Sequence, residues 1–333
     1  MTDYAVDQSP ASNEPDEEAI ADLPDGSLRG RRGDRRARRA ARSLRAARVP
    51  RAPMSPARVT ALALVCGPTA LALWFFLYAL VLSGLQESHT QHVLYSQLRY
   101  GLSQAIVPFG GTIAPGTAVA YIQAPSIGLS AVAVEGTSSS DLAKGPGLLP
   151  DTPFPGQAGN AQIYGRSATY GAPFGAVHDL RPGALIAVTT GQGTFDYHVL
   201  DVRVPGDPRP TAAQLGQSSL TLVTSGGSGA WRDGWAPDEV IYADARLVAG
   251  TIQPSPPGRP DAVPAVDKPM AGDTNELVPV VFWLEALVVL SVGLGWAYTR
   301  WTMWQIWLVG LPALLAVLWA TTNAAMLLLP NLA

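Results

Sequence analysis

The sequence predicts a mainly β protein, a closed or nearly closed barrel or sandwich that three apolar helices hold in a membrane. Strand-like alternation recurs between residues 118 and 248, where Pro-Gly, Gly-Gln-Gly and Gly-Asp-Pro mark turns. Short strands at this spacing, with little helix, are typical of barrels and sandwiches. Three other segments are apolar over about 20 residues or more, the length that crosses the hydrocarbon core of a bilayer.

Composition divides the 333 residues into consecutive segments. They are a tail over 1–58, a membrane helix over 59–82, a helical stalk over 83–117, the barrel over 118–249, a Pro-rich linker over 250–276, and membrane helices over 277–299 and 304–329. The barrel, at about 130 residues, has a usual size for a domain. Recurrent prolines in the linker favour an extended, semi-rigid spacer over packed structure.

The N-terminal tail has almost no large apolar side chains, so we expect it to be disordered. Residues 3–25 carry eight acids and no base, whereas Arg29–Arg51 carries eleven arginines and one acid, Asp34. Because these arginines precede a membrane helix, they predict a cytoplasmic N-terminus. They are also candidates for contact with anionic lipid, and nucleic acid is the weaker alternative.

The predicted membrane segments set a multi-pass topology. Val59–Leu82 contains no charged residue, begins far from Met1 and lacks a small-residue cleavage site, so it predicts an uncleaved anchor. The barrel after it is then extracytoplasmic. Arg300, in the turn between the last two segments, fits a cytoplasmic hairpin tip, which leaves the C-terminus outside.

The single cysteine, Cys66, lies inside the first apolar segment. A disulfide within the chain is therefore excluded, and so is a cysteine-based metal site. We expect no cofactor and no metal.

A candidate site lies in Gly159–Phe174, GNAQIYGRSATYGAPF. This stretch predicts a buried strand, a turn at Gly165 and then a small polar loop. Enzymes place reactive side chains where a strand meets such a loop, because the rigid element holds the backbone still. The residue at that point is Arg166.

Residues 119–248 resemble a sortase, and more narrowly the actinobacterial class E type. The resemblance lies in the blocks YIQAPSIGLSAVAVEGTSSSDLAKGPGLLPDTPFPGQAGNAQIYGRSATYGAPF, DLRPGALIAVTTGQGTFDYHVLDVRVP and SLTLVTS, whose order and spacing agree with the family. It implies an eight-stranded sortase barrel at the cell envelope.

The resemblance also implies where catalysis would occur. Active sortases cut a sorting signal with a cysteine thiolate and pass the acyl group to an amine, with a histidine as acid and base and an arginine at the oxyanion. Here the histidine position is Arg166 and the cysteine position is Ser225, in TLVTSGG. The arginine position falls at Asp238 or Glu239.

These substitutions predict that the site is catalytically silent. A serine hydroxyl is a weak nucleophile without an adjacent base, and an arginine stays protonated and accepts no proton. An acid at the third position would repel an oxyanion. The domain's two histidines, His178 and His198, fall outside the loop that carries the family's base.

Two functional hypotheses remain open. In the first, the chain is a pseudo-sortase that binds or scaffolds envelope or membrane proteins through the barrel groove and the C-terminal helices, and Arg166 holds a carboxylate from Asp238, Glu239 or a partner. In the second, it is an active transpeptidase or hydrolase that uses Ser225 in place of cysteine.

Overall fold

The computed structural model describes residues 56–208, 216–226, 237 and 239–333. The predictions for residues 1–55 and for Asp238 therefore lie outside the described residues. The chain divides into two compact units, 1–64 and 65–333, and every contact described below lies within the second unit.

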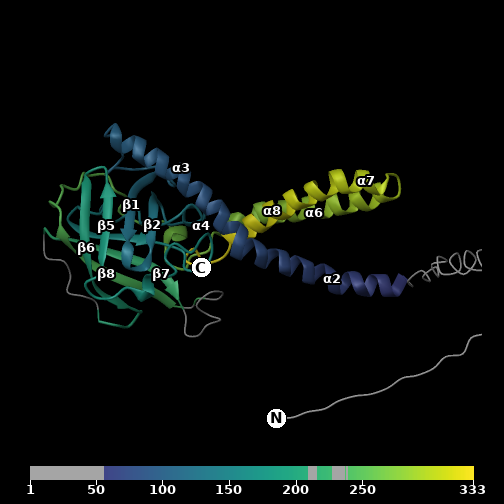
Figure 1. Ribbon diagram of the computed structural model, residues 1–333, viewed down its shortest axis with the longest axis horizontal. Coiled ribbons are helices and arrows are strands. Elements are labelled where there is room, and N and C mark those ends of the chain that lie inside the picture. Colours follow the sequence, from purple (N-terminus) through teal and green to yellow (C-terminus); the bar gives the residue numbers. More distant parts are fainter. Residues whose placement is uncertain (1–55, 209–215, 227–236, 238) are drawn as a thin grey trace, which may run out of the picture. The chain divides into compact units, whose positions relative to one another are not determined.

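Eight strands close into a barrel (Figure 1). They are β1 Ala118–Ala124, β2 Leu129–Glu135, β3 Gly147–Leu148, β4 Gly159–Tyr164, β5 Leu185–Thr190, β6 Gly193–Arg203, β7 Ser218–Gly226 and β8 Glu239–Ala249. Around the barrel their order is β1-β2-β3-β4-β7-β8-β6-β5, and β5 closes the ring on β1. Only the β2–β3 and β4–β7 pairs are parallel among these strands. The predicted mainly β barrel is confirmed.

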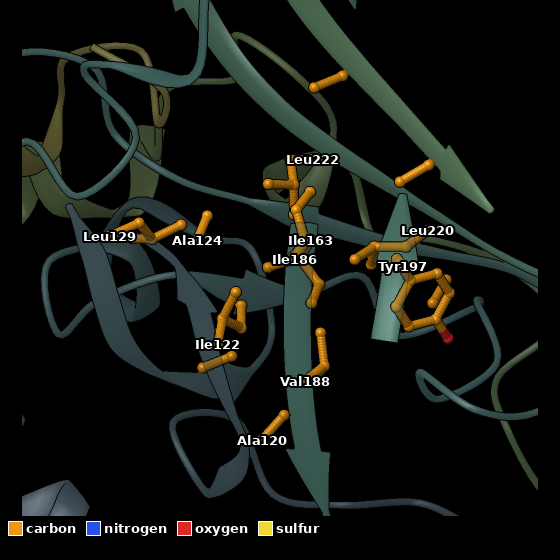
Figure 2. Close-up of a cluster of buried hydrophobic side chains, with 14 of the residues drawn as sticks. Ala120, Ile122, Ala124, Leu129, Ile163, Ile186, Val188, Tyr197, Leu220 and Leu222 are labelled. Atoms are coloured by element: carbon orange, nitrogen blue, oxygen red, sulfur yellow. The ribbon is translucent and has the colours of Figure 1, made fainter. Parts of the chain in front are cut away.

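The barrel core consists of the apolar side chains that alternate along the strands. Ile122 of β1, Ile163 of β4 and Leu222 of β7 are fully buried and converge inside the barrel (Figure 2). Burying one such side chain stabilises the fold by about 1.5–3 kcal/mol. Tyr197 of β6 is also fully buried, and its hydroxyl accepts a hydrogen bond from the Gly156 N–H. The core therefore fixes the strand ends that carry the candidate site.

A continuous helical stretch precedes the barrel. It consists of α2, Pro56–Leu77, a π-helical turn, Tyr78–Leu82, and α3, Ser83–Ser103. Leu94 and Leu98 of α3 are buried against the first two strands, in a cluster with Val132 and Val134. The predicted stalk is thus a helix that packs on the barrel.

The chain ends in a helical hairpin. Its elements are α6, Leu277–Tyr298, the short α7, Met303–Gln305, a π-helical turn, Ile306–Gly310, and α8, Leu311–Leu327. Among the described residues, three helices are long and apolar enough to cross a membrane: Val65–Ser103, Thr274–Tyr298 and Met303–Leu327. They correspond to the three predicted membrane segments.

The Pro-rich segment 250–276 forms no strand, but it lies on the barrel and does not span free solvent. Arg259 forms a 2.6 Å ion pair with Glu135, at the end of β2, and both side chains are almost fully buried. Asp267 accepts hydrogen bonds from the N–H and hydroxyl of Thr137. Because buried charges need partners, these contacts tie the segment to the barrel.

The buried Glu135 predicts a pH dependence of stability. Burial raises the pKa of Glu135 from 4.5 to about 7, although the Arg259 guanidinium opposes this shift. The folded state therefore holds a proton that the unfolded chain releases above pH 4.5, so this contribution to stability is lost as the pH rises toward 7. We expect the unfolding temperature of Glu135→Gln, followed by circular dichroism, to fall less across this window than that of the wild type. Parallel pH profiles of the two proteins would contradict the assignment.

Candidate functional site

Arg166 follows β4 and is completely buried. Gly165 precedes it at a point where a Cβ atom would overlap the Phe174 ring, so the turn requires glycine. Nη1 of Arg166 donates to Thr169 Oγ1 at 3.1 Å and to Ala333 O at 3.0 Å, and Nη2 donates to Ser139 O at 3.1 Å. Burial lowers the pKa of Arg166 to about 10, so the guanidinium stays protonated at neutral pH.

The sequence predicts a carboxylate beside Arg166, from Asp238, Glu239 or a partner. Glu239, the first residue of β8, is exposed and pairs across the sheet with Gly226. Asp238 is outside the described residues. The guanidinium donates to a hydroxyl and two main-chain oxygens and lies 4.9 Å from the centre of the Tyr170 ring. Among the described residues, the guanidinium thus meets a hydroxyl and main-chain oxygens, one of which belongs to Ala333, the last residue of the printed sequence.

Ser225, the second-to-last residue of β7, has only 3% of its surface exposed. Its hydroxyl donates to Leu332 O at 2.7 Å and lies 2.8 Å from the hydroxyl of Ser167, the residue after Arg166. The fold therefore brings the loop after β4 and the end of β7 together. No pattern in the sequence indicates Ser167, whose hydroxyl makes this contact with Ser225.

The last residues of the printed sequence, Pro330–Ala333, complete the site, and we call them the C-terminal segment (Figure 1). Leu332 O accepts hydrogen bonds from Ser225 Oγ and from the N–H of Ser167. Ala333 O accepts from Arg166 and, at 2.6 Å, from Thr169 Oγ1. Four residues therefore present donors to two consecutive carbonyls, and we call them the donor cluster: Arg166, Ser167, Thr169 and Ser225.

The side chains of the C-terminal segment are also held by the barrel. Leu332 is completely buried in an apolar cluster with Leu142, Leu149, Tyr164 and Val223. The Asn331 amide donates to Thr137 O at 2.7 Å and to Lys268 O at 3.0 Å. The segment is thus recognised through one apolar side chain, one amide and its main chain.

The loop after β4 also contacts the helices. The N–H of Tyr170 donates to Ser83 Oγ of α3, and its hydroxyl donates to Asn323 Oδ1 of α8. The same Asn323 oxygen accepts from the Tyr78 hydroxyl at 2.9 Å. Tyr170 has a left-handed backbone (φ 49°), which is costly for a residue with a side chain and persists only where its surroundings hold it. These contacts position the donor cluster.

Among the described residues, the hydrogen-bond partners of Ser225 include no histidine, aspartate or glutamate side chain. The partners of the Ser225 hydroxyl are another hydroxyl and a carbonyl oxygen. His178 and His198 are both exposed, and His198 faces outward from β6, opposite Leu185 and Arg246 in register. Among the described residues, no group of three or more His, Cys, Asp and Glu side chains could hold a metal ion. The described part of the arrangement can bind main-chain oxygens.

Comparison with known proteins supports the assignment of the fold. Residues 122–241 match the family model of the sortase domain, so the barrel has the sortase fold. The chain is similar to a sortase D transpeptidase from Clostridium perfringens at 22% identity, over 49% of this chain and 98% of the other (TM-score 0.39). It is similar to a mutant of sortase E from Streptomyces avermitilis at 27% identity, over 41% and 91% (TM-score 0.35), and to sortase SrtA from Actinomyces oris at 23%, over 42% and 85% (TM-score 0.36). A comparison with curated proteins found no match.

The sequence carries one signal for the C-terminal segment. Pro330 ends the apolar run of α8, because proline cannot continue a helix, and leaves Asn331, Leu332 and Ala333 beyond it. The predicted topology also places the end of the chain on the same side of the membrane as the barrel. Neither observation identifies the barrel residues that bind it.

The shared acceptor Asn323 predicts a measurable coupling between helix and loop. Asn323→Leu removes the oxygen that Tyr78 and Tyr170 both contact, and a buried unpaired hydroxyl costs about 1–3 kcal/mol. We expect Asn323→Leu to lower the free energy of unfolding in detergent by that amount. Tyr170→Phe should cost less in the Asn323→Leu background than in the wild type. Additive effects in this double-mutant cycle would exclude the coupling.

Proposed function

We propose that this chain is a membrane-anchored pseudo-sortase, a sortase-fold protein that binds peptide and does not cleave it. The observation that carries the proposal is the environment of Ser225, whose hydroxyl contacts a second hydroxyl and a carbonyl oxygen and, among the described residues, no histidine or carboxylate side chain. Serine needs such a base to attack a carbonyl. Arg166, at the position of the family's histidine, is a permanent cation.

The proposed role is that of a binding or scaffolding component at the cell envelope. We place the N-terminus in the cytoplasm and the barrel outside, because the arginine-rich tail precedes the first apolar helix. The partners would be envelope or membrane proteins that meet the donor cluster and the C-terminal helices, with anionic lipid at the arginine-rich tail. Donors aimed at carbonyl oxygens support this role, since they suit a peptide main chain.

An assay of turnover tests this function. The detergent-solubilised full chain is incubated with sorting-signal peptides and an amine, beside an active sortase as positive control. We expect no cleavage or transpeptidation above buffer, and the same result for Ser225→Ala, because the described partners of the Ser225 hydroxyl include no histidine or carboxylate side chain. A serine-directed activity probe should leave Ser225 unlabelled.

The opposite result would support the alternative function. Turnover by the wild type that Ser225→Ala abolishes would make the protein an active sortase-type transpeptidase or hydrolase, with Ser225 as the nucleophile. The matched control is Ser219→Ala, on the same strand, because the Ser219 hydroxyl contacts Asn160 and the Gly159 carbonyl and not the donor cluster. Loss of turnover in both variants would point to damage to the fold.

A further inference from the structure

We propose that the C-terminal segment is a displaceable ligand of the donor cluster, and that the partner which displaces it is a peptide of the same chemistry. That partner presents a leucine-like side chain and two adjacent main-chain carbonyls, and it has no charged side chain at the positions of Asn331–Ala333. The inference rests on the proposed function, since it names the ligand of that site. It adds that the site is occupied until a competing peptide arrives.

The first argument is that the contacts recognise a main chain. Leu332 O is an acceptor that any peptide supplies, Ala333 O belongs to the last residue of the printed sequence, and the donor cluster meets both. Specificity comes from the apolar cluster around Leu332 and from the Thr137 and Lys268 carbonyls, which bind an amide donor. A second peptide with these features would make the same contacts, so it would compete with the C-terminal segment.

The second argument is that the site retains unused hydrogen-bonding capacity. Arg166 is fully buried, and its Nε has no hydrogen-bond partner within the described part of the chain. The Asn331 side-chain oxygen is likewise buried without a partner. Buried polar groups are normally satisfied, so the fit of the C-terminal segment is incomplete. A peptide that gives Arg166 Nε an acceptor, and that places no unpaired oxygen at the position of Asn331, would bind better than the segment does.

The third argument concerns the cost of displacement. The C-terminal segment has four residues, Pro330–Ala333, and follows α8. Leu332 is its one large apolar anchor. Segments with few buried apolar contacts open at low free energy. The tether favours closure, because it keeps the segment at an effective concentration on the order of millimolar beside the donor cluster. A partner peptide must therefore bind more tightly than a free copy of the segment.

Thiol labelling tests the occlusion directly in the full chain. In a Cys66→Ser background, Ser225→Cys places the only thiol beneath Leu332, where Ser225 is 3% exposed. We expect a water-soluble maleimide to react with it at least about tenfold faster when residues 330–333 are deleted, because loss of the segment exposes the strand end. The matched control is Val248→Cys on β8, at 53% exposure, whose rate should not change.

A second pair of variants keeps the test decisive if the deletion unfolds the barrel. Leu332→Ala preserves the chain length and removes the apolar anchor, and Thr169→Val removes one donor to Ala333 O. Both should raise the labelling rate of Ser225→Cys while circular dichroism stays unchanged. If every folded variant is labelled at the wild-type rate, the C-terminal segment does not occlude the site and the proposal fails.

Peptide binding tests the second half of the proposal. A fluorescent peptide with the sequence of residues 328–333, Leu-Leu-Pro-Asn-Leu-Ala, should bind the deletion variant at least about tenfold more tightly than it binds the wild type, because the tethered copy competes. The same peptide with aspartate at its second-to-last position is the control and should not bind. Equal affinity for both proteins, or equal binding of the control peptide, would overturn the proposal.

The outcomes separate this proposal from the proposed function. Turnover dependent on Ser225 would refute the pseudo-sortase, whereas unchanged labelling and unchanged peptide affinity would refute the displaceable ligand. A chain that turns over substrate only after deletion of residues 330–333 would contradict catalytic silence and would still support occlusion by the C-terminal segment.

Discussion

The site depends on a buried positive charge, the Arg166 guanidinium, that hydrogen-bond acceptors stabilise. Arg166 is fully buried and stays protonated at neutral pH, and among the described residues it contacts a threonine hydroxyl, two main-chain oxygens and an aromatic ring. Removing a charge from water is costly, so each of these dipoles is needed to offset the loss of hydration. One of them, Ala333 O, belongs to the C-terminal segment. Arg166 and the C-terminal segment that it binds are therefore parts of one arrangement.

The same arrangement links the barrel to the apolar helices. Tyr170 lies against the Arg166 guanidinium and also contacts Ser83 of α3 and Asn323 of α8. Helix α8 thus contains Asn323, the acceptor that holds the Tyr170 loop. The C-terminal segment that the donor cluster binds follows the same helix. A shift of α8 would alter both contacts together, so occupancy of the site and the packing of the helical hairpin are physically coupled.

The barrel could be predicted from the sequence because strand alternation is a local property. The predicted strands correspond to observed ones, while β3, with two residues, is too short to leave a periodic signal. The position of Arg166 between a strand and a polar loop is a local signal, whereas Ser225 follows only from the resemblance, which carries spatial information that spacing alone lacks. The contacts of Leu332 with Ser225, and of Arg259 with Glu135, join residues more than 100 positions apart. No local pattern encodes such pairings. The proline-rich composition around Arg259 instead favours an extended spacer, so the ion pair with Glu135 could not be predicted.

The serine at position 225 suits the binding of a carbonyl better than an attack on it. A hydroxyl donates a strong, short hydrogen bond, as Ser225 does to Leu332 O at 2.7 Å. A thiol is a weak donor, and a thiolate would place a negative charge against the same oxygen. Arg166 acts in the same way at the next carbonyl, where a neutral histidine would offer a single N–H. Arg166 and Ser225 therefore each donate to a main-chain oxygen, and under the proposed function the same two residues account for both the absence of turnover and the binding of peptide.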